Sequence, residues 1–269
     1  MHPAPTPDHP VLTAPEALLK VARLAATRAG DHALGNVRRR GEVNVISRHD
    51  VKHILDVECQ AVATETILAA CPGDAILGEE TAGEECPAPE GAEWIIDPID
   101  GTVNFFHGLP HWCCSVAVRR GGVMQAGVVC APELGLVFEA TLDGPARCNG
   151  HPIRCSALAD PSHALVLTGS DKTEDPARSF RFFAALARLV QRPRVLGAAA
   201  LDICMVARGA AEGYFEHGVY LWDIAAASLI IERAGGASEI LKHHGGYRLA
   251  FLASNGHLHA ALKACLLGA

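Results

Sequence analysis

The spacing of apolar side chains predicts two helices at the start of the chain. Thr13, Pro15 and Glu16 resemble a capping box, which predicts a helix from there to about Ala29, ended by Gly30. The charged, glycine-containing segment 38–42 then predicts a mobile loop. Downstream of Asp50, a periodic apolar stretch predicts the second helix through Val51, Ile54, Leu55, Val57 and Val62.

Short apolar runs bounded by turn residues predict a strand-rich middle of the chain, at 75–77, 94–96, 113–118, 123–130 and 136–141. Gly121-Gly122 lies between two of these runs as a hairpin turn does, so this part is expected to be largely antiparallel. From residue 164 the pattern changes to alternating strands and helices, which is typical of an α/β half. The expected strands are 165–168, 194–196, 212–215 and 249–253. The expected helices follow Asp175-Pro176, cover 199–208, run from Trp222 to the glycine pair at 235–236, and close the chain at 258–267.

Composition limits the kind of protein that these elements can build. With 269 residues, of which 49% are hydrophobic and 20% charged, the chain can bury the core of one large domain or of two fused halves. The net charge of −7, spread over mixed charges, provides no extended positive surface, so nucleic acid is not the expected partner. The ten cysteines include no Cys-x-x-Cys and are expected to be buried thiols. No signal-like start and no run of 18 apolar residues is present, so a soluble cytoplasmic protein is expected.

The most informative segment is Trp94-Ile-Ile-Asp-Pro-Ile-Asp-Gly-Thr-Val-Asn-Phe, in which a buried strand ends in two carboxylates. Asp97 and Asp100 flank a proline, and the turn is expected to direct both acids out of the strand end. Mg²⁺ prefers a few carboxylate and carbonyl oxygens together with water and phosphate oxygens, so this pair provides half of a site. The carbonyl of Ile99 can add a ligand. Free N–H groups at Gly101 and Thr102 can bind a phosphate.

Two weaker acidic motifs lie at comparable element ends. Glu79 and Glu80 follow the strand at 75–77, where a solvated pair is the ordinary interpretation. Asp223 follows Trp222 at a helix start, where a helix cap is the ordinary interpretation. Only their occurrence together with Asp97 and Asp100 favours a shared metal site.

The segments GEE, WIIDPIDGTVNF and LWDIAAASLIIERAGG resemble the ordered signature motifs of the inositol monophosphatase family, a group of Mg-dependent, lithium-sensitive phosphatases. GVVCAP and CNGHPIRCS are also similar to that family, and the resemblance runs from about residue 13 to 265. It implies a layered α-β-α-β-α sandwich, usually a homodimer, with two to three Mg²⁺ ions. We therefore expect a flexible tail at 1–12 and one domain at 13–269. Its α+β half, about 13–160, is expected to carry the metal site, and its α/β half, about 161–269, the specificity residues.

The resemblance also implies roles for individual residues. Glu79, Asp97, Asp100 and Asp223 match the family's metal-binding acids, and Ile99 would add its carbonyl. Thr102 matches the threonine that, with Glu79 and a metal, activates the attacking water. The backbone of Gly101 and Thr102 would hold the phosphate, and Glu216 matches a position that contacts the inositol ring. The resulting sets are catalytic Glu79, Asp97 and Thr102, metal-binding Glu79, Asp97, Ile99, Asp100 and Asp223, and substrate-binding Gly101, Thr102, Glu216 and Asp223.

Three positions bear on how far the resemblance extends. Ala198 stands in Gly-Ala-Ala where the family usually has Ser or Thr, so a hydroxyl donor is lost. This loss weakens the expectation that the protein recognises inositol phosphate, whereas the expectation of metal-dependent hydrolysis is unaffected. Arg39 stands near the position at which many family members carry a lysine in the loop of the third-metal region. Arginine there keeps the positive charge but changes the geometry of the donors. Asp50 matches a family acid near the third metal, where an indirect role and a plain helix cap remain equal alternatives.

The expected substrate is inositol 1-phosphate. The alternatives are histidinol phosphate, fructose 1,6-bisphosphate or a 3′-phosphoadenosine phosphate, and a regulatory protein that binds the transcription machinery is the competing class. His49 and His53 flank Asp50 but lack a third soft ligand, so exposed histidines are expected there. Surface or loop positions are expected for the other histidines considered, which are His107, His111, His243 and His244.

Overall fold

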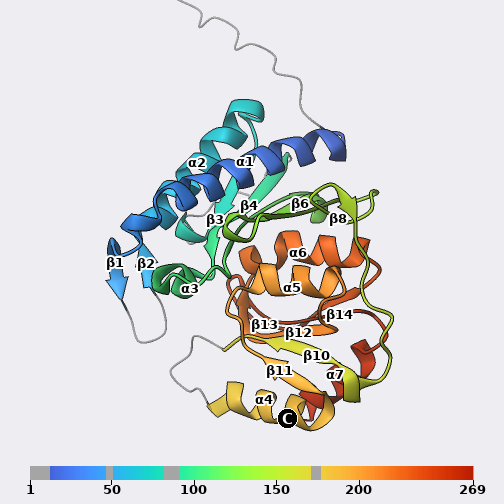
Figure 1. Ribbon diagram of the computed structural model, residues 1–269. Coiled ribbons are helices and arrows are strands. Elements are labelled where there is room, and N and C mark those ends of the chain that lie inside the picture. Colours follow the sequence, from blue (N-terminus) through green and yellow to red (C-terminus); the bar gives the residue numbers. More distant parts are fainter. Residues whose placement is uncertain (1–12, 47–50, 82–90, 171–176, 269) are drawn as a thin grey trace, which may run out of the picture.

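In the computed structural model, which describes residues 13–46, 51–81, 91–170 and 177–268, the chain forms five alternating layers of helix and sheet (Figure 1). The sheets have seven and five strands. The predicted α-β-α-β-α layering is confirmed. The layers in order are α1 (Pro15–Gly35) with α2 (Ile54–Ala70), the seven-stranded sheet, α5 (Ala199–Ala207) with α6 (Leu221–Arg233), the five-stranded sheet, and α4 (Ala177–Leu189) with α7 (His259–Leu267).

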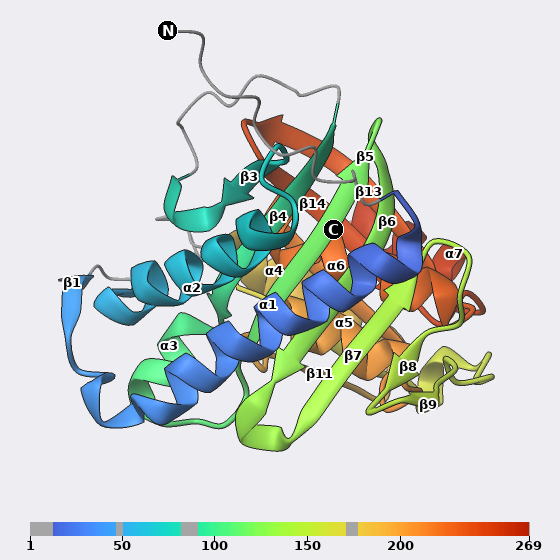
Figure 2. The same ribbon diagram turned by 90° about the horizontal axis from the view of Figure 1, so that it is seen from above.

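Helix α1 lies beside α2 across the outer face of the first sheet (Figure 2). It does not stop at Gly30, as its sequence predicts, but continues to Gly35. Gly30 is buried in this helix, with Cys130 and Pro132 close by, and the packing of the helix outweighs the poor helix propensity of glycine. The predicted capping box is also wrong, because Ala14 is the N-cap and Pro15 starts the helix without a side-chain cap.

The second predicted helix starts later than expected. Val51–His53 forms strand β2, paired antiparallel with β1 (Val43–Ile46), and α2 begins only at Ile54. The predicted loop before it contains a 3₁₀ turn, η1 (Val37–Arg39). Strand pairing has therefore overridden the helical spacing of Val51. Asp50 and His49 lie outside the described residues.

The first sheet has the strand order β3-β4-β5-β6-β7-β8-β9 and is antiparallel except for the parallel pair β3·β4. Gly121 and Gly122 form the predicted hairpin with φ angles of 55° and 80°, as a type I′ turn requires. The strands are β3 (Ala75–Gly78), β4 (Ala92–Asp100), β5 (Cys113–Arg120), β6 (Val123–Ala131), β7 (Leu136–Thr141), β8 (Arg147–Cys148) and β9 (His151–Pro152). Three short turns, η2 (Glu79–Thr81), η3 (Pro132–Leu134) and η4 (Pro161–His163), and helix α3 (Thr102–His107) connect neighbouring elements.

The second sheet has the order β11-β10-β12-β14-β13, and its strands are β10 (Leu165–Thr168), β11 (Arg192–Arg194), β12 (Gly213–Tyr220), β13 (Ala237–Gly245) and β14 (Arg248–Ser254). The strand expected at 194–196 lies at 192–194 instead, where it pairs in register with residues 165–167 of β10. Beyond its end, the carbonyl of Leu196 accepts a hydrogen bond from the Asn104 side chain. Pro193 is tolerated because β11 is an edge strand. The chain pattern missed β13 altogether.

Three apolar clusters fill the spaces between the five layers, and the largest of them surrounds α5 and α6 on both sides. Strand β5 is buried on both faces: Cys114 and Val116 face α1 and α2, whereas Cys113 and Ala117 face α5 and α6. A third cluster joins the second sheet to α4 and α7. The described cysteines are free thiols, and most of them are buried as expected. The end of β4 is thus packed between two cores, and a charged side chain there is removed from water.

Candidate functional site

A bulge at the end of β4 brings Asp97 and Asp100 to one face of the sheet. Asp97 pairs with Ser115 and Asp100 with Cys113, so three steps along β4 match two steps along β5. Residues three apart normally point to opposite faces of a strand, and the extra residue of the bulge removes that alternation. Both acids therefore share the face of Cys113, which looks toward α5 and α6.

Asp223 approaches the same place from the second half of the chain. It is the third residue of α6, and its Oδ2 accepts the Tyr220 N–H at 2.7 Å. It is thus a helix cap, as one interpretation of its sequence position holds. Ligand atoms of Asp97, Asp100 and Asp223 also lie within 4.8 Å of one another. One residue fits both expectations, since its two oxygens can serve a cap and an ion.

Burial gives this acidic cluster its chemistry. Asp97 is 1% exposed, and its Oδ1 has no hydrogen-bond partner. Burial raises the pKa of Asp97 well above its usual range, and the charges of Glu79, Asp100 and Asp223 raise it further. Burial, together with the charge of Asp202, raises the pKa of Asp100 to about 7. A buried carboxylate oxygen without a partner, among other acids, fits a hard divalent cation.

Glu79 follows β3, which runs parallel to β4, so the carboxyl ends of both strands meet at one edge. Among the neighbouring charges, that of Glu79 raises the pKa of Asp97 the most. Glu79 is nevertheless outside the group of acids whose ligand atoms lie within 4.8 Å of one another. Gln60 of α2 holds the turn: its Oε1 accepts the Glu80 N–H at 3.0 Å. A Cβ at Gly78 would lie 2.3 Å from the Gln60 side chain, which explains the glycine there.

Gly101 and Thr102 begin α3 directly after Asp100. Gly101 has φ = 90°, and a Cβ there would lie 3.0 Å from the Ala198 side chain and from the His111 carbonyl. The Thr102 hydroxyl donates to the carbonyl of Ile99 at 3.0 Å. The two groups that the sequence assigns to water activation and to metal binding therefore touch each other.

Asp100 also connects the two halves of the chain. Its carboxylate accepts the N–H groups of Ala199 at 3.0 Å and Ala200 at 2.7 Å, at the start of α5. The N-cap residue of that helix is Ala198, which has no side chain able to cap it. The Asp100 carboxylate, which comes from strand β4, therefore caps the start of α5.

Two further contacts fix this junction, and sequence reasoning missed both. Asn104 donates through Nδ2 to the carbonyls of His111 and Leu196, each at 2.7 Å. The His111 ring lies 2.7 Å from Asp202, a 1% exposed acid of α5. His111 is in a loop as expected, but it has a partner in the structure. An acid in the first turn of an otherwise apolar predicted helix was the available signal.

His244 also has a partner, because its Nε2 lies 2.8 Å from the carbonyl of His217. His107 is exposed, as expected.

Glu216 lies on β12, where the Tyr214 hydroxyl donates to its Oε2 at 2.6 Å. The charges of Glu216, Asp202 and Asp100 all act on this phenol, which is fully buried. Glu216 thus bonds a phenol on whose pKa the charge of Asp100, a member of the acidic cluster, also acts.

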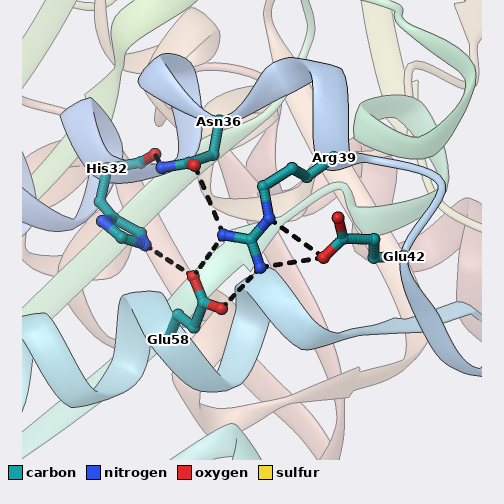
Figure 3. Close-up of polar contacts among 5 residues, drawn as sticks. All are labelled: His32, Asn36, Arg39, Glu42 and Glu58. Atoms are coloured by element: carbon teal, nitrogen blue, oxygen red, sulfur yellow. Dashed lines mark hydrogen bonds and ion pairs between the residues drawn. The ribbon is translucent and has the colours of Figure 1, made fainter.

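Arg39 lies near the end of α1 and contacts Asn36, Glu42 and Glu58 (Figure 3). Its guanidinium bonds both oxygens of Glu58, at 2.8 and 3.0 Å, and Oε2 of Glu42 at 3.0 Å. The Nε2 atom of His32 lies 2.9 Å from Oε2 of Glu58 and forms a further hydrogen bond with it. These bonds, with Arg39 the largest cause, lower the pKa of Glu58 to about 2. The guanidinium fork ties η1 and the residue before β1 to α2, a geometry that lysine cannot reproduce.

No helix in the described ranges has the length and apolar character needed to cross a bilayer.

Known proteins resemble this chain in sequence and in fold over most of its length. A Nus factor SuhB of Pasteurella multocida is 34% identical over 249 residues, which is 91% of either chain. An inositol-1-monophosphatase of Mycobacterium leprae is 36% identical over 222 residues, covering 78% of this chain and 76% of that protein. The solved structure of an inositol monophosphatase from Anabaena has a TM-score of 0.82 at 31% identity and covers 94% of this chain and 96% of its own. The profile of the inositol monophosphatase family matches residues 14–268, and this chain therefore belongs to that family.

Proposed function

We propose that this chain is a Mg²⁺-dependent phosphatase that hydrolyses a small phosphate monoester, with inositol 1-phosphate as the first substrate to test. Its family and its relatives support phosphatase chemistry. The observation that carries the metal assignment is the cluster of the buried Asp97 and Asp100 with the half-buried Asp223, in which one oxygen of Asp97 lacks a partner. Acid clusters at this depth are stable when a divalent cation compensates them.

Within this proposal, Asp97, Asp100 and Asp223 would hold Mg²⁺, with Glu79 and the carbonyl of Ile99 as further ligands. Bound Mg²⁺ supplies a Lewis acid that acidifies water and stabilises the leaving oxygen of the ester.

The protein's own groups do the positioning. The Glu79 carboxylate and the Thr102 hydroxyl would orient the attacking water, and Glu79 would accept its proton. The N–H groups of Gly101 and Thr102, at the start of α3, would bind the phosphate. Glu216 would accept a hydrogen bond from a substrate hydroxyl. No covalent enzyme intermediate is required.

Phosphate release is the direct test. The purified chain is incubated with Mg²⁺ and, separately, inositol 1-phosphate, histidinol phosphate, fructose 1,6-bisphosphate and a 3′-phosphoadenosine phosphate. We expect release from inositol 1-phosphate, its loss with EDTA, and inhibition by lithium. Absence of release from all four esters would contradict the enzyme assignment, whereas a preference for another ester would correct the substrate alone.

We include two assembly proposals in this function. A homodimer is expected from the family resemblance, and light scattering at assay concentration measures it. A relative is named as a Nus factor, so a second role in binding transcription proteins has a specific basis. Co-purification of a tagged, full-length chain with transcription-complex subunits, compared with the Asp97→Asn variant, would show whether such binding depends on the metal site.

A further inference from the structure

The direction of the β12 side chains sets the geometry around Glu216. Tyr214 belongs to the core that surrounds α5 and α6, whereas Phe215 belongs to the core under α4 and α7. Because side chains alternate along a strand, Glu216 leaves β12 on the same face as Tyr214. That face looks toward the layer between the two sheets, where the acidic cluster lies.

Tyr214 holds the Glu216 carboxylate by a short hydrogen bond. The distance from the phenol oxygen to Oε2 of Glu216 is 2.6 Å, in the range of bonds to a charged acceptor. Tyr214 is fully buried, and burial, followed by the charges of Glu216, Asp202 and Asp100, raises its pKa well above the usual range. The phenol is therefore protonated and donates. A phenylalanine would fill the same space without this bond.

A glycine on the neighbouring strand provides the space into which this carboxylate fits. Gly169 follows β10 and donates its N–H to the carbonyl of Phe215 at 3.2 Å. A Cβ at Gly169 would lie 1.7 Å from Oε2 of Glu216. Any larger residue at this position would displace the carboxylate. Gly169 therefore leaves the space that the Glu216 carboxylate occupies, and the Tyr214 hydroxyl bonds one of its oxygens.

We propose that Tyr214 and Gly169 set substrate selectivity by fixing the Glu216 carboxylate in the orientation that accepts a substrate hydroxyl. Tyr214 is a positioning residue, since it acts through Glu216 and does not touch the substrate. The selectivity applies to phosphate esters of polyols, whose hydroxyls need an acceptor, relative to esters that carry none. This inference rests on the proposed phosphatase function.

The experiment compares two esters in the same enzyme preparation with Mg²⁺. Inositol 1-phosphate carries hydroxyls beside the phosphate, whereas p-nitrophenyl phosphate carries none, so the ratio of their kcat/KM values reports hydroxyl recognition. We expect Tyr214→Phe to lower this ratio about tenfold, the factor that corresponds to one hydrogen bond involving a charged group. The loss should fall on KM for inositol 1-phosphate. Gly169→Ala should lower the same ratio by an independent route.

A double-mutant cycle separates positioning from a general structural effect. If Tyr214 acts through Glu216, Tyr214→Phe should change the ratio little once Glu216→Gln is present. Tyr247→Phe is the matched control: this tyrosine is 38% exposed on the β13–β14 hairpin, and its substitution should leave the ratio as in the wild type.

Two results would overturn the inference. One is an unchanged ratio in Tyr214→Phe while Glu216→Gln lowers it, and the other is full additivity of the two substitutions. A wild-type chain that releases phosphate from neither ester would instead overturn the proposed function, so the two failures can be told apart.

Discussion

Replacing Asp97 with asparagine should raise the stability of the metal-free protein while abolishing its response to Mg²⁺. The change keeps the shape of the side chain and removes one negative charge from a cluster of buried acids. Sign and size follow from the raised pKa of Asp97: a carboxyl whose pKa is higher in the folded state destabilises the fold increasingly as pH rises above about 4. Each unit by which a folded-state pKa exceeds the unfolded value costs about 1.4 kcal/mol at neutral pH, so asparagine should raise the free energy of unfolding in EDTA.

Magnesium reverses the order of the two proteins. A ligand at 100 times its Kd stabilises the fold by about 2.7 kcal/mol, which corresponds to roughly 5–8 °C in Tm for a chain of this size. The wild type should show this shift and Asp97→Asn should not. Turnover of inositol 1-phosphate by the variant should be lost in the same samples.

Thermal unfolding in EDTA and in saturating Mg²⁺, at pH 7.5 and at pH 5, provides the four measurements that are needed. In EDTA the advantage of Asp97→Asn should shrink at pH 5, because protonation then relieves the wild-type cluster. Asp74→Asn is a useful control, since this acid accepts the Trp94 indole N–H far along the sheet from the cluster. An Asp97→Asn protein that is less stable than the wild type in EDTA, or that keeps the Mg²⁺ shift, would refute the electrostatic reasoning.

Three further predictions concern the surroundings of the cluster. Gln60→Met keeps the side-chain volume but loses the bond to the Glu80 N–H. The Mg²⁺ concentration for half-maximal activity should therefore rise several-fold, which corresponds to about 1 kcal/mol. An unchanged concentration would mean that Gln60 does not position the Glu79 turn. Asn104→Asp places a carboxylate against two carbonyl oxygens and should lower the free energy of unfolding in urea by about 2–3 kcal/mol, more than Asn104→Ala does; the reverse order would contradict the clamp. Arg39→Lys should raise the pH at which the protein unfolds in acid. The lowered pKa of Glu58 contributes stability that is fully present above about pH 4.5 and is lost as the pH falls toward 2, and lysine should reduce that contribution. A midpoint pH equal to that of the wild type would show that the fork is not needed.

The layered fold was predictable where local pattern and burial agree. Strands β5 to β7 alternate between two apolar cores, and their glycine hairpin leaves little choice of topology. The errors lie where pairing with another strand decides. The helical spacing of Val51 gives no sign that Val51–His53 pairs with β1. Likewise, β11 lies at 192–194 because it pairs in register with β10, which starts at Leu165.

For the candidate site, chemistry was easier to predict than geometry. Asp97 and Asp100 stand out in a buried strand end, but their common orientation depends on a bulge whose partner residues lie on β5. Asp202 and Asn104 gave a weak signal or none, because an acid or amide inside an apolar segment acquires meaning only with its partner. Those partners, His111 and the carbonyl of Leu196, become adjacent only when the two halves pack together.

Asp100 links metal binding to the packing of the two halves. Its two oxygens cap α5, so the charge that an ion would attract is already shared with the N–H groups of Ala199 and Ala200. A helix N-terminus stabilises a carboxylate as an anion, which offsets part of the burial that raises the pKa of Asp100. A serine or threonine at Ala198 could cap the helix itself and reduce its dependence on Asp100. Because Ala198 cannot cap α5, substitution of Asp100 should weaken the contact between α5 and β4 as well as remove a proposed ligand.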